Sequence, residues 1–535
     1  MAVARTSKVA RHVVETYYDS ASDDPQVLQI WAYSDRIACR AGDLITLRVS
    51  TTAQHYDLEI GRDGLTYETL HSASGLPGRH HTAPADCSIA GCGWPVAWEF
   101  RVPQDWRPGG YLITLTARCG SQTVEYHHIV LIGSPRDAPP APLLLVCATP
   151  TWVAYNDWGG SNAYDGIAGP NGDRFSPVLS TQRPWSRGFA RLPDGAPRTL
   201  PDRPFPPGTA VRYPHMEWAW ANGYSKKYAS AGWASYERHF ARWAEREGLA
   251  FDITSLHELH GDPHRLDGHR CAVFVGHDEY WSAPMRDAVD AFVDNGGRVA
   301  RFAGNFLWQI RLADEERTQI CYKYIAAAED PLMGTSEQKL VSNAWEAPEI
   351  GRPGATTFGV NGTRGMYAGL GHCVGRGAGG FTIYRPEHWA FKSAFLGYGD
   401  LLGAQSRIFG YEVDGLDHVV RNGLPFATGE DGAPDGLVIL ALGLATNQEE
   451  DFGLWGEERF IADDDARYLA ETIYGGLNEE TLDRARRGNG MIVHFARGRG
   501  EVFTAATCEW VNGLRLGDMQ VEQVTRNVLE RFCQA

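Results

Sequence analysis

Between residues 143 and 304 the sequence alternates short apolar runs with segments of helical spacing. The apolar runs lie at residues 143–148, 251–254, 271–276 and 298–304. Continuous apolar runs of this length are typical of strands that are buried on both faces, as in parallel sheets. Helical spacing is found at 237–249 and 282–295, the latter with Ser282 placed as its N-cap. The alternation predicts an α/β fold with a doubly wound, mostly parallel sheet.

The part of the chain before this region has a different period. Short alternating or apolar runs lie at residues 27–33, 44–50, 56–60, 97–102, 110–118 and 123–131. Turn clusters rich in Gly, Asp and Pro separate these runs, a spacing typical of a β-sandwich. The segment SPRDAPPAP at 134–142 follows with four prolines and is expected to form a stiff linker.

These patterns divide the chain into two predicted domains. We expect an immunoglobulin-like β-sandwich at residues 1–135 and an α/β catalytic domain at residues 136–535. The second domain carries an insertion rich in Pro, Trp and Tyr near residues 185–234. Towards its end we expect strands at 436–442, 491–496 and 501–505 and a helix at 520–532.

Charge and composition narrow the choice of partners. Sixty-six acidic residues against 50 basic ones give a formal net charge of −16, which repels nucleic acids and anionic membranes. No apolar run approaches the ~20 residues that span a bilayer, and residues 1–16 lack the apolar core of a secretory signal. The ten cysteines include no CxxC pair. We therefore predict a cytoplasmic protein with reduced thiols that binds neither nucleic acid nor membrane.

In an open α/β sheet, ligands bind outside the carboxyl ends of the strands. That rule selects residues 149–165, 277–281 and 305–308, and these stretches belong to a longer series of blocks. The blocks are TWVAYNDWGGSNAYDG at 151–166, GHDEYWS at 276–282, GGRVARFAGNFLW at 296–308, YRPEHWAF at 384–391, GYEVDG at 410–415 and residues 501–532. Taken in this order, they resemble the large (beta) subunit of N,N-dimethylformamidase.

The resemblance implies a class I glutamine-amidotransferase-like core and an enzyme that hydrolyses an amide bond with one mononuclear ferric ion. Carried over block by block, the implied iron ligands are Tyr155, Tyr164 and Glu279. The implied catalytic residues around the metal are His277, Asn305 and Glu412. No further cofactor is predicted.

This sequence also departs from the family pattern. The connection between the two tyrosines is shorter, the insertion near residues 185–234 lies between Tyr164 and Glu279, and a lectin-like N-terminal domain has no counterpart. Subunit assembly is therefore expected to differ. We predict a homo-oligomer, with a separate small partner subunit as a further possibility.

The chemistry of these residue types is consistent with the implied metal. A tyrosine has a reference pKa of about 10, so two phenolate ligands require a strongly polarising cation. Two phenolates and one carboxylate balance a 3+ ion with hard oxygen donors. Three protein ligands leave positions for water and a substrate carbonyl. Glu412 is then placed to move the proton of the water, and Asn305 to orient the substrate or stabilise the oxyanion.

Each residue also has an ordinary structural interpretation. A tyrosine after a strand is usually a core or rim aromatic, His277 can be a supporting or helix-capping residue, and Asn305 can occupy a left-handed turn. At the level of function, two alternatives stay open. One is a ferric-tyrosinate oxygenase acting on an aromatic substrate, and the other is a non-catalytic binding member of the fold. Metal content separates the binding member from the two enzymes, and dioxygen consumption separates the oxygenase from the hydrolase. For the hydrolase, the expected substrate is a small or N-substituted amide.

Overall fold

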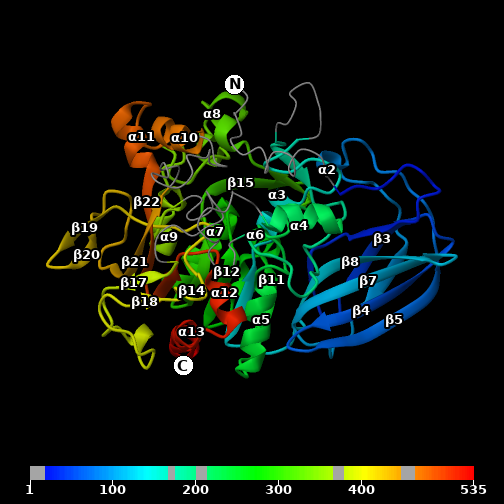
Figure 1. The fold of residues 1–535 in the computed structure, drawn as a ribbon, viewed down its shortest axis with the longest axis horizontal. Coiled ribbons are helices and arrows are strands. Elements are labelled where there is room, and N and C mark those ends of the chain that lie inside the picture. Colours follow the sequence, from blue (N-terminus) through cyan, green and yellow to red (C-terminus); the bar gives the residue numbers. More distant parts are fainter. Residues whose placement is uncertain (1–18, 167–174, 200–213, 366–378, 447–463, 535) are drawn as a thin grey trace.

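The computed structural model describes residues 19–166, 175–199, 214–365, 379–446 and 464–534 (Figure 1). Part of the predicted insertion, residues 200–213, lies outside the described residues, and so do residues 1–18 and 535 at the ends of the two predicted domains.

A nine-stranded sheet forms the centre of the protein, in the order β11-β9-β12-β14-β23-β22-β21-β17-β18. Its strands are β9 (Leu143–Cys147), β11 (Phe251–Ser255), β12 (Cys271–His277), β14 (Arg298–Gly304), β17 (Phe381–Ile383), β18 (Leu401–Leu402), β21 (Val438–Thr446), β22 (Arg487–Arg497) and β23 (Gly500–Ala505). All four apolar runs predicted as strands between residues 143 and 304 are confirmed. The strands predicted near 436–442, 491–496 and 501–505 are present as β21, β22 and β23.

The prediction of a doubly wound, mostly parallel sheet of the glutamine-amidotransferase-like type is wrong. Among the described strands of the nine-stranded sheet, four pairings are parallel, from β11 to β23. The other four, from β23 to β18, are antiparallel. The cause is local: β22 ends at Arg497 and β23 begins at Gly500, and so short a connection permits only antiparallel pairing, whereas parallel strands need a long crossover.

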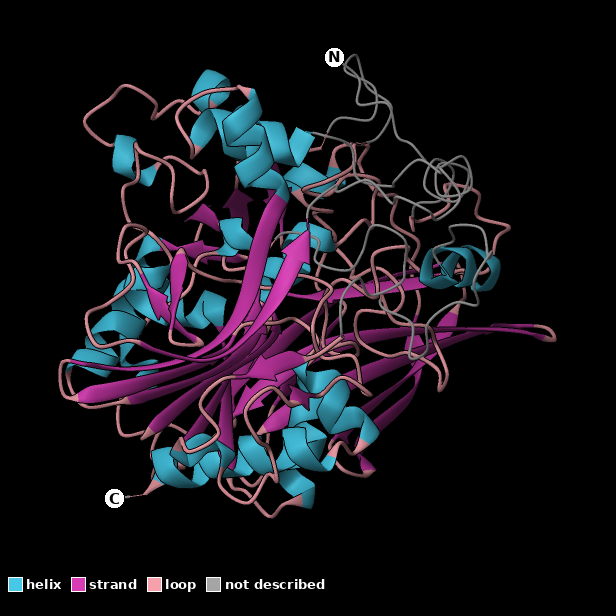
Figure 2. Ribbon diagram, turned by 60° about the vertical axis from the view of Figure 1, so that its left-hand side comes forward, coloured by secondary structure: helices cyan, strands magenta, loops and turns pink. Residues whose placement is uncertain are grey.

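Helices cover both faces of the parallel half of this sheet (Figure 2). One face carries α6 (Leu256–Gly261), α7 (Ala283–Asp294) and α9 (Ala355–Phe358), and the other carries α5 (Glu237–Arg246), α12 (Trp510–Leu516) and α13 (Met519–Cys533). Phe274 of β12 packs in the same core as Met285 of α7, while its neighbour Val273 packs in the core that contains Trp510. Because successive strand side chains point to opposite faces, the continuous apolar runs are needed to fill both cores.

Two sheets form the N-terminal part of the chain, at the right of Figure 1. One consists of β2 (Ala38–Arg40), β8 (Gln122–Gly133), β7 (Gly109–Cys119), β4 (His55–Asp63) and β5 (Tyr67–Pro77), and the other of β1 (Ile30–Ser34), β3 (Leu44–Thr51) and β6 (Trp98–Arg101). Both contribute to one apolar core that contains Trp31, Val49 and Ile113. Leu112 and Ile129, however, belong to the core of the nine-stranded sheet, so the two parts pack together. The domain boundary at residue 135 stays a prediction.

Smaller elements complete the structure. A four-stranded sheet contains β10 (Val178–Ser180), β16 (Thr318–Ile320), β15 (Trp308–Ala313) and β13 (Tyr280–Ser282), and a separate hairpin contains β19 (His418–Arg421) and β20 (Leu424–Ala427). The remaining α-helices are α2 (Cys87–Ala90), α3 (Thr149–Tyr155), α4 (Pro214–Asn222), α8 (Ala326–Glu329), α10 (Asp464–Thr472) and α11 (Glu479–Arg486). Single 3-10 turns lie at Pro263–Leu266, Lys323–Ile325, Gln338–Leu340, Gly362–Arg364 and Trp389–Phe391. None of the described helices combines the length and the apolar character that crossing a membrane requires.

Candidate active site

The six side chains implied by the resemblance lie together at the carboxyl end of the parallel half of the main sheet. They are Tyr155, Tyr164, His277, Glu279, Asn305 and Glu412, and contacts shorter than about 3.5 Å link all of them. They come from the end of α3, from the ends of β12 and β14, and from two loops. Tyr155 is the last residue of α3, the helix that follows β9. His277 is the last residue of β12, and Asn305 follows β14.

Tyr155, Tyr164 and Glu279 form what we call the oxygen cluster. The two phenol oxygens lie 3.0 Å apart, and the Tyr155 hydroxyl donates to Glu279 Oε2 at 3.0 Å. The Tyr164 hydroxyl donates to the other carboxylate oxygen, Oε1. The tyrosine rings pack against each other with centroids 4.6 Å apart. The three side chains therefore converge, although Glu279 lies more than 100 positions from either tyrosine in the chain.

His277, Asn305 and Glu412 form a second group, the histidine cluster, beside the first. His277 Nε2 lies 3.0 Å from Glu412 Oε2 and 3.3 Å from Glu279 Oε2, so the imidazole lies between the two carboxylates. Asn305 Nδ2 donates to Glu412 Oε2 at 2.6 Å. Asn305 has a φ of 66°, the left-handed conformation that asparagine tolerates better than most residues. The turn conformation and the role in the site are thus compatible.

Burial and neighbouring charge act on these groups in opposite directions. Burial on its own would raise the pKa of Glu279, but hydrogen bonding and positive charge from His277, with the charge of Lys323, hold it below its usual value. Burial raises the pKa of Glu412, and His277 and Asn305 offset this effect only in part. Burial would lower the pKa of His277, yet its contacts with the two carboxylates raise it to about 10. His277 is therefore an imidazolium that joins two carboxylates.

Burial and the neighbouring carboxylate also shift the pKa of Tyr155. Burial raises the pKa of Tyr155 well above its usual value, and the negative charge of Glu279 raises it further. Without a cation, Tyr155 is thus a neutral phenol that donates hydrogen bonds. A phenolate at this position requires a bound positive charge.

Four further side chains surround the oxygen cluster and were not predicted from the sequence. Lys323 Nζ lies 3.4 Å from the ring centroid of Tyr164 and donates to the hydroxyl of Tyr280 at 3.1 Å. Tyr280 in turn donates to the hydroxyl of Tyr164 at 3.0 Å. Trp308 Nε1 donates to Glu279 Oε1 at 2.7 Å, and the Tyr411 hydroxyl lies 3.0 Å from His277 Nδ1. Tyr280, Trp308 and Tyr411 had a signal in the sequence, because they lie in the GHDEYWS, GGRVARFAGNFLW and GYEVDG blocks, whereas Lys323 lies in none of the blocks.

The insertion near residues 185–234 reaches the site. The backbone carbonyl of Ser230 accepts a hydrogen bond from His277 Nδ1 at 2.7 Å. Lys227 Nζ lies 5.0 Å from the ring centroid of Tyr164 and 3.1 Å from Asp165 Oδ2. The insertion therefore helps to orient His277 and adds positive charge near the tyrosines.

A buried arginine connects the segments that carry both clusters. Arg301 of β14 binds Asp278 through Nε at 2.8 Å and Nη2 at 2.6 Å, and its Nη1 lies 2.8 Å from Asp414 Oδ2. Asp278 precedes Glu279, and Asp414 Oδ1 accepts a hydrogen bond from the backbone of Asn305 at 2.6 Å. All three charged side chains are almost fully buried. This triad fixes the strand ends and the loop of residues 410–415 relative to one another.

The donor set of the oxygen cluster fits the ferric ion implied by the resemblance. Metal–oxygen distances of about 2.0–2.1 Å for a small hard cation place neighbouring ligand oxygens roughly 3 Å apart, which is the separation of the Tyr155 oxygen from those of Tyr164 and Glu279. Phenolate and carboxylate are hard donors, and tyrosinate is an established ligand of ferric haem iron. Their combined charge of 3− matches the ion.

The chain thus has a mixed α/β sheet with its candidate site at the strand ends. The family described as N,N-dimethylformamidase beta subunit-like, C-terminal, matches residues 53–525. The chain therefore belongs to this family, and the match includes the strands from β4 to β8 as well as the main sheet. A comparison with curated proteins found no match.

Proposed function

We propose that this protein is an iron-dependent hydrolase that cleaves the C–N bond of a small or N-substituted amide. The observation that carries the proposal is the convergence of Tyr155, Tyr164 and Glu279, whose oxygens meet beside a buried imidazolium and a second carboxylate. These residues are the proposed ligands of one ferric ion. When bound, the ion would polarise the amide carbonyl and lower the pKa of a water molecule.

Glu412 is the proposed general base. Its pKa is raised by burial, so it accepts a proton more readily than an exposed glutamate does. In the forward reaction, Glu412 takes a proton from the attacking water as the new C–O bond forms. It then delivers this proton to the amine nitrogen as the C–N bond breaks, so that the carboxylate is regenerated.

Asn305 and His277 position the base. The Asn305 amide nitrogen holds Glu412 Oε2 at 2.6 Å, and His277 Nε2 holds the same oxygen at 3.0 Å. The carbonyl oxygen of Asn305 is buried and has no hydrogen-bond partner among the residues that the structure describes. That oxygen is available to accept a hydrogen bond from water or from a substrate N–H. A buried acceptor without a partner is costly, so a bound ligand would satisfy it.

Iron content and amine release test this function together. The purified protein should contain one iron per chain, show a tyrosinate-to-iron charge-transfer colour, and release amine from a panel of N-substituted formamides and acetamides. Tyr155→Phe and Tyr164→Phe should each bleach or shift the colour. A colourless protein without iron would overturn the metal assignment, and dioxygen consumption coupled to turnover would favour the oxygenase alternative.

Assembly belongs to the same proposal. The family is described as beta subunit-like, which supports a homo-oligomer or a complex with a separate small subunit. Light scattering at micromolar concentrations should show a particle larger than one 59.0 kDa chain. A monomer at every concentration would contradict the homo-oligomer. Cytoplasmic location likewise stays a prediction.

A further inference from the structure

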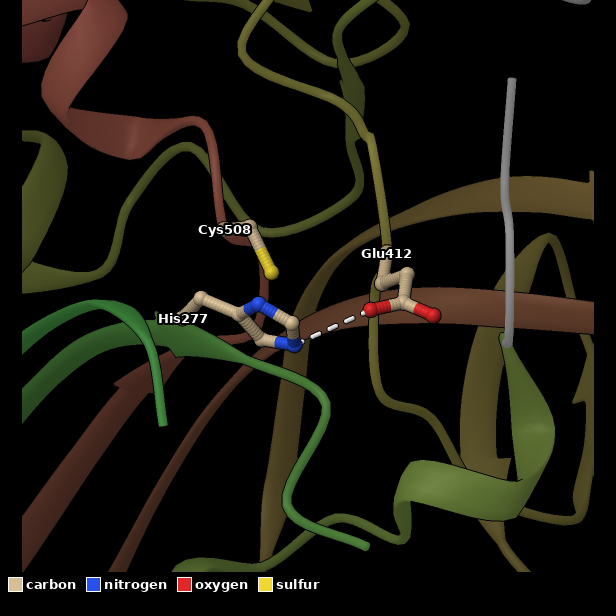
Figure 3. Close-up of side chains that lie close together, drawn as sticks. All are labelled: His277, Glu412 and Cys508. Atoms are coloured by element: carbon tan, nitrogen blue, oxygen red, sulfur yellow. Dashed lines mark ion pairs between the residues drawn. The ribbon is translucent and has the colours of Figure 1, made fainter. Parts of the chain in front are cut away.

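One buried cysteine lies against the histidine cluster without a role in the proposed reaction. Figure 3 shows Cys508 together with His277 and Glu412. One potential ligand atom from each of these residues lies within 4.8 Å of the other two, and the three residues are at most 2% exposed. The backbone N–H of Cys508 donates to the carbonyl oxygen of Glu412 at 3.0 Å, which keeps the two segments together.

The surroundings of Cys508 make it a poor nucleophile. Burial raises the pKa of the thiol well above its usual value, and the carboxylates of Glu412, Asp414 and Glu509 raise it further. Reactive cysteines need the opposite environment, with positive charge or a helix N-terminus nearby. Clustered carboxylates instead create a negative potential, which attracts cations.

We propose that His277, Glu412 and Cys508 form a second cation site, selective for a borderline metal ion such as Zn²⁺ and distinct from the oxygen cluster. Imidazole, carboxylate and thiolate are the three ligand types of protein zinc sites, and three protein ligands leave one tetrahedral position open. The thiol proton of Cys508 and one imidazolium proton of His277 are both released to solvent as the sulfur–metal and nitrogen–metal bonds form. The two phenols and the carboxylate of the oxygen cluster are all hard donors.

The two proposed sites are thus adjacent but differ in their ligands. The oxygen cluster offers only hard oxygen donors, whereas the second site includes a soft thiolate. Glu279 Oε2 of the oxygen cluster lies only 3.3 Å from His277 Nε2, so the proposed zinc site borders the proposed iron site. Zinc at the second site would engage Glu412 and His277, which are the proposed base and its partner. Zn²⁺ should therefore inhibit hydrolysis without displacing iron. The proposed zinc binding does not depend on the proposed function, whereas the proposed inhibition rests on it.

Cadmium is the most direct probe of the binding. Cd²⁺ has the same preference for thiolate, and its bond to sulfur gives an ultraviolet charge-transfer band. Titration of the full-length protein with CdCl₂ should produce this band with one equivalent. Cys508→Ser should abolish the band and weaken binding by about 10-fold or more, since even supporting groups around a metal are worth 10- to 100-fold. Cys39→Ser is the matched control, because Cys39 is equally buried but lies in the N-terminal sheet.

Two further measurements keep the binding claim decisive if Cys508→Ser does not fold. X-ray absorption of the wild-type protein with one Zn²⁺ should show a sulfur neighbour at about 2.3 Å. The double variant Tyr155→Phe, Tyr164→Phe lacks both phenol oxygens and should still give the cadmium band. A zinc shell of oxygen and nitrogen alone, or cadmium binding without the sulfur band, would overturn the proposal.

The inhibition is measured on the same proteins. Zn²⁺ should slow amide hydrolysis by the wild type, and Cys508→Ser should raise the inhibitory zinc concentration by about 10-fold or more. Full activity with zinc bound through sulfur would refute the inhibitory role. If the protein shows neither iron nor amide hydrolysis but does show the cadmium band, the proposed function fails while the cation site stands.

Discussion

The oxygen cluster and the histidine cluster each contain one buried glutamate, and both glutamates lie within 3.3 Å of His277 Nε2. Their pKa values nevertheless shift in opposite directions from the same starting value, down for Glu279 and up for Glu412. Glu279 has the added charge of Lys323 and hydrogen bonds from Tyr164 and Trp308. Glu412 has none of these among its described contacts. A carboxylate that stays ionised suits a metal ligand, and one that accepts protons readily suits a base.

The largest expected effect is that of Glu279→Gln. The variant removes one of three balancing negative charges from the oxygen cluster, so iron and the charge-transfer colour should be lost. Turnover should fall by about 10³-fold or more, because metal polarisation contributes several kcal/mol and each 1.36 kcal/mol is worth tenfold in rate. Iron analysis beside amine release measures both. Retention of full iron and colour would contradict a ligand role for Glu279.

Glu412→Gln should distinguish the role of the histidine cluster from that of the oxygen cluster. The variant keeps the oxygen cluster intact, so iron content and colour should remain near those of the wild type. Turnover should fall by about 10²- to 10⁴-fold, the usual contribution of a general base. Iron content, colour and kcat are measured on one preparation.

Glu346→Gln is the matched control for both glutamate variants. Its covered carboxyl accepts a hydrogen bond from the backbone of Gly354 and belongs to neither cluster. Activity and colour should persist in this variant. If Glu412→Gln loses iron while Glu279→Gln keeps it, the assignment of the two glutamates is reversed.

Arg301 is the residue that holds the two clusters in register, and its removal is the next largest effect. Arg301→Met leaves Asp278 and Asp414 buried without their partner, which should lower the free energy of unfolding by about 3–5 kcal/mol. Urea denaturation measures this loss. Asp278 precedes Glu279 of the oxygen cluster, and Asp414 binds the backbone of Asn305 in the histidine cluster. Loss of Arg301 should therefore disturb both clusters, and kcat should fall more than KM rises.

Arg286→Met separates that positioning role from a general loss of stability. Arg286 is also fully buried, but it binds backbone carbonyls and threonine hydroxyls between α7 and α9 rather than either cluster. This variant should be destabilised while its kcat stays close to that of the wild type. An equal loss of kcat in both arginine variants would count against a special role for Arg301.

The parallel half of the main sheet could be predicted because its strands and helices have clear periods. The run at 271–276 is apolar throughout, and Ser282 accepts a hydrogen bond from Met285 N as an N-cap should. The carboxyl-end rule then pointed to His277, Glu279 and Asn305 from their positions alone. Assigning roles to them needed the family resemblance.

Only part of the antiparallel half could be predicted: β21, β22 and β23 were expected as strands, but β17 and β18 were not. β17 and β18 have only three and two residues, too few to show a period, and they lie in a glycine-rich region. Lys323 and Cys508 illustrate the same limit within the site. Lys323 lies outside the matched blocks, and Cys508 lies in the block at 501–532 without a motif that singles it out. Only the tertiary fold brings Lys323 to Tyr164 and Cys508 to Glu412. Long-range packing therefore supplied what local periodicity does not encode.

Glu237 sharpens the comparison because it is a buried glutamate whose pKa is governed by burial and hydrogen bonds, with no cation among the described groups that shift it. It begins α5, is 1% exposed and accepts hydrogen bonds from Ala148 N at 3.0 Å and Trp152 Nε1 at 3.1 Å. Its other carboxyl oxygen has no partner among the described residues. Burial raises the pKa of Glu237 to about 7, although these hydrogen bonds lower it in part.

The smallest predicted effect is therefore a pH dependence of stability. Because the folded-state pKa lies above the unfolded value, the folded state binds the proton more tightly, and the stabilisation is complete only below the unfolded pKa. The free energy of unfolding should fall as pH rises from about 4.5 through about 7, by roughly 3 kcal/mol at most. Glu237→Gln should remove the contribution of Glu237 to this slope and be more stable than the wild type at pH 8. Urea denaturation from pH 5 to 8 measures both proteins, and parallel curves would show that burial without a cation does not govern this carboxyl.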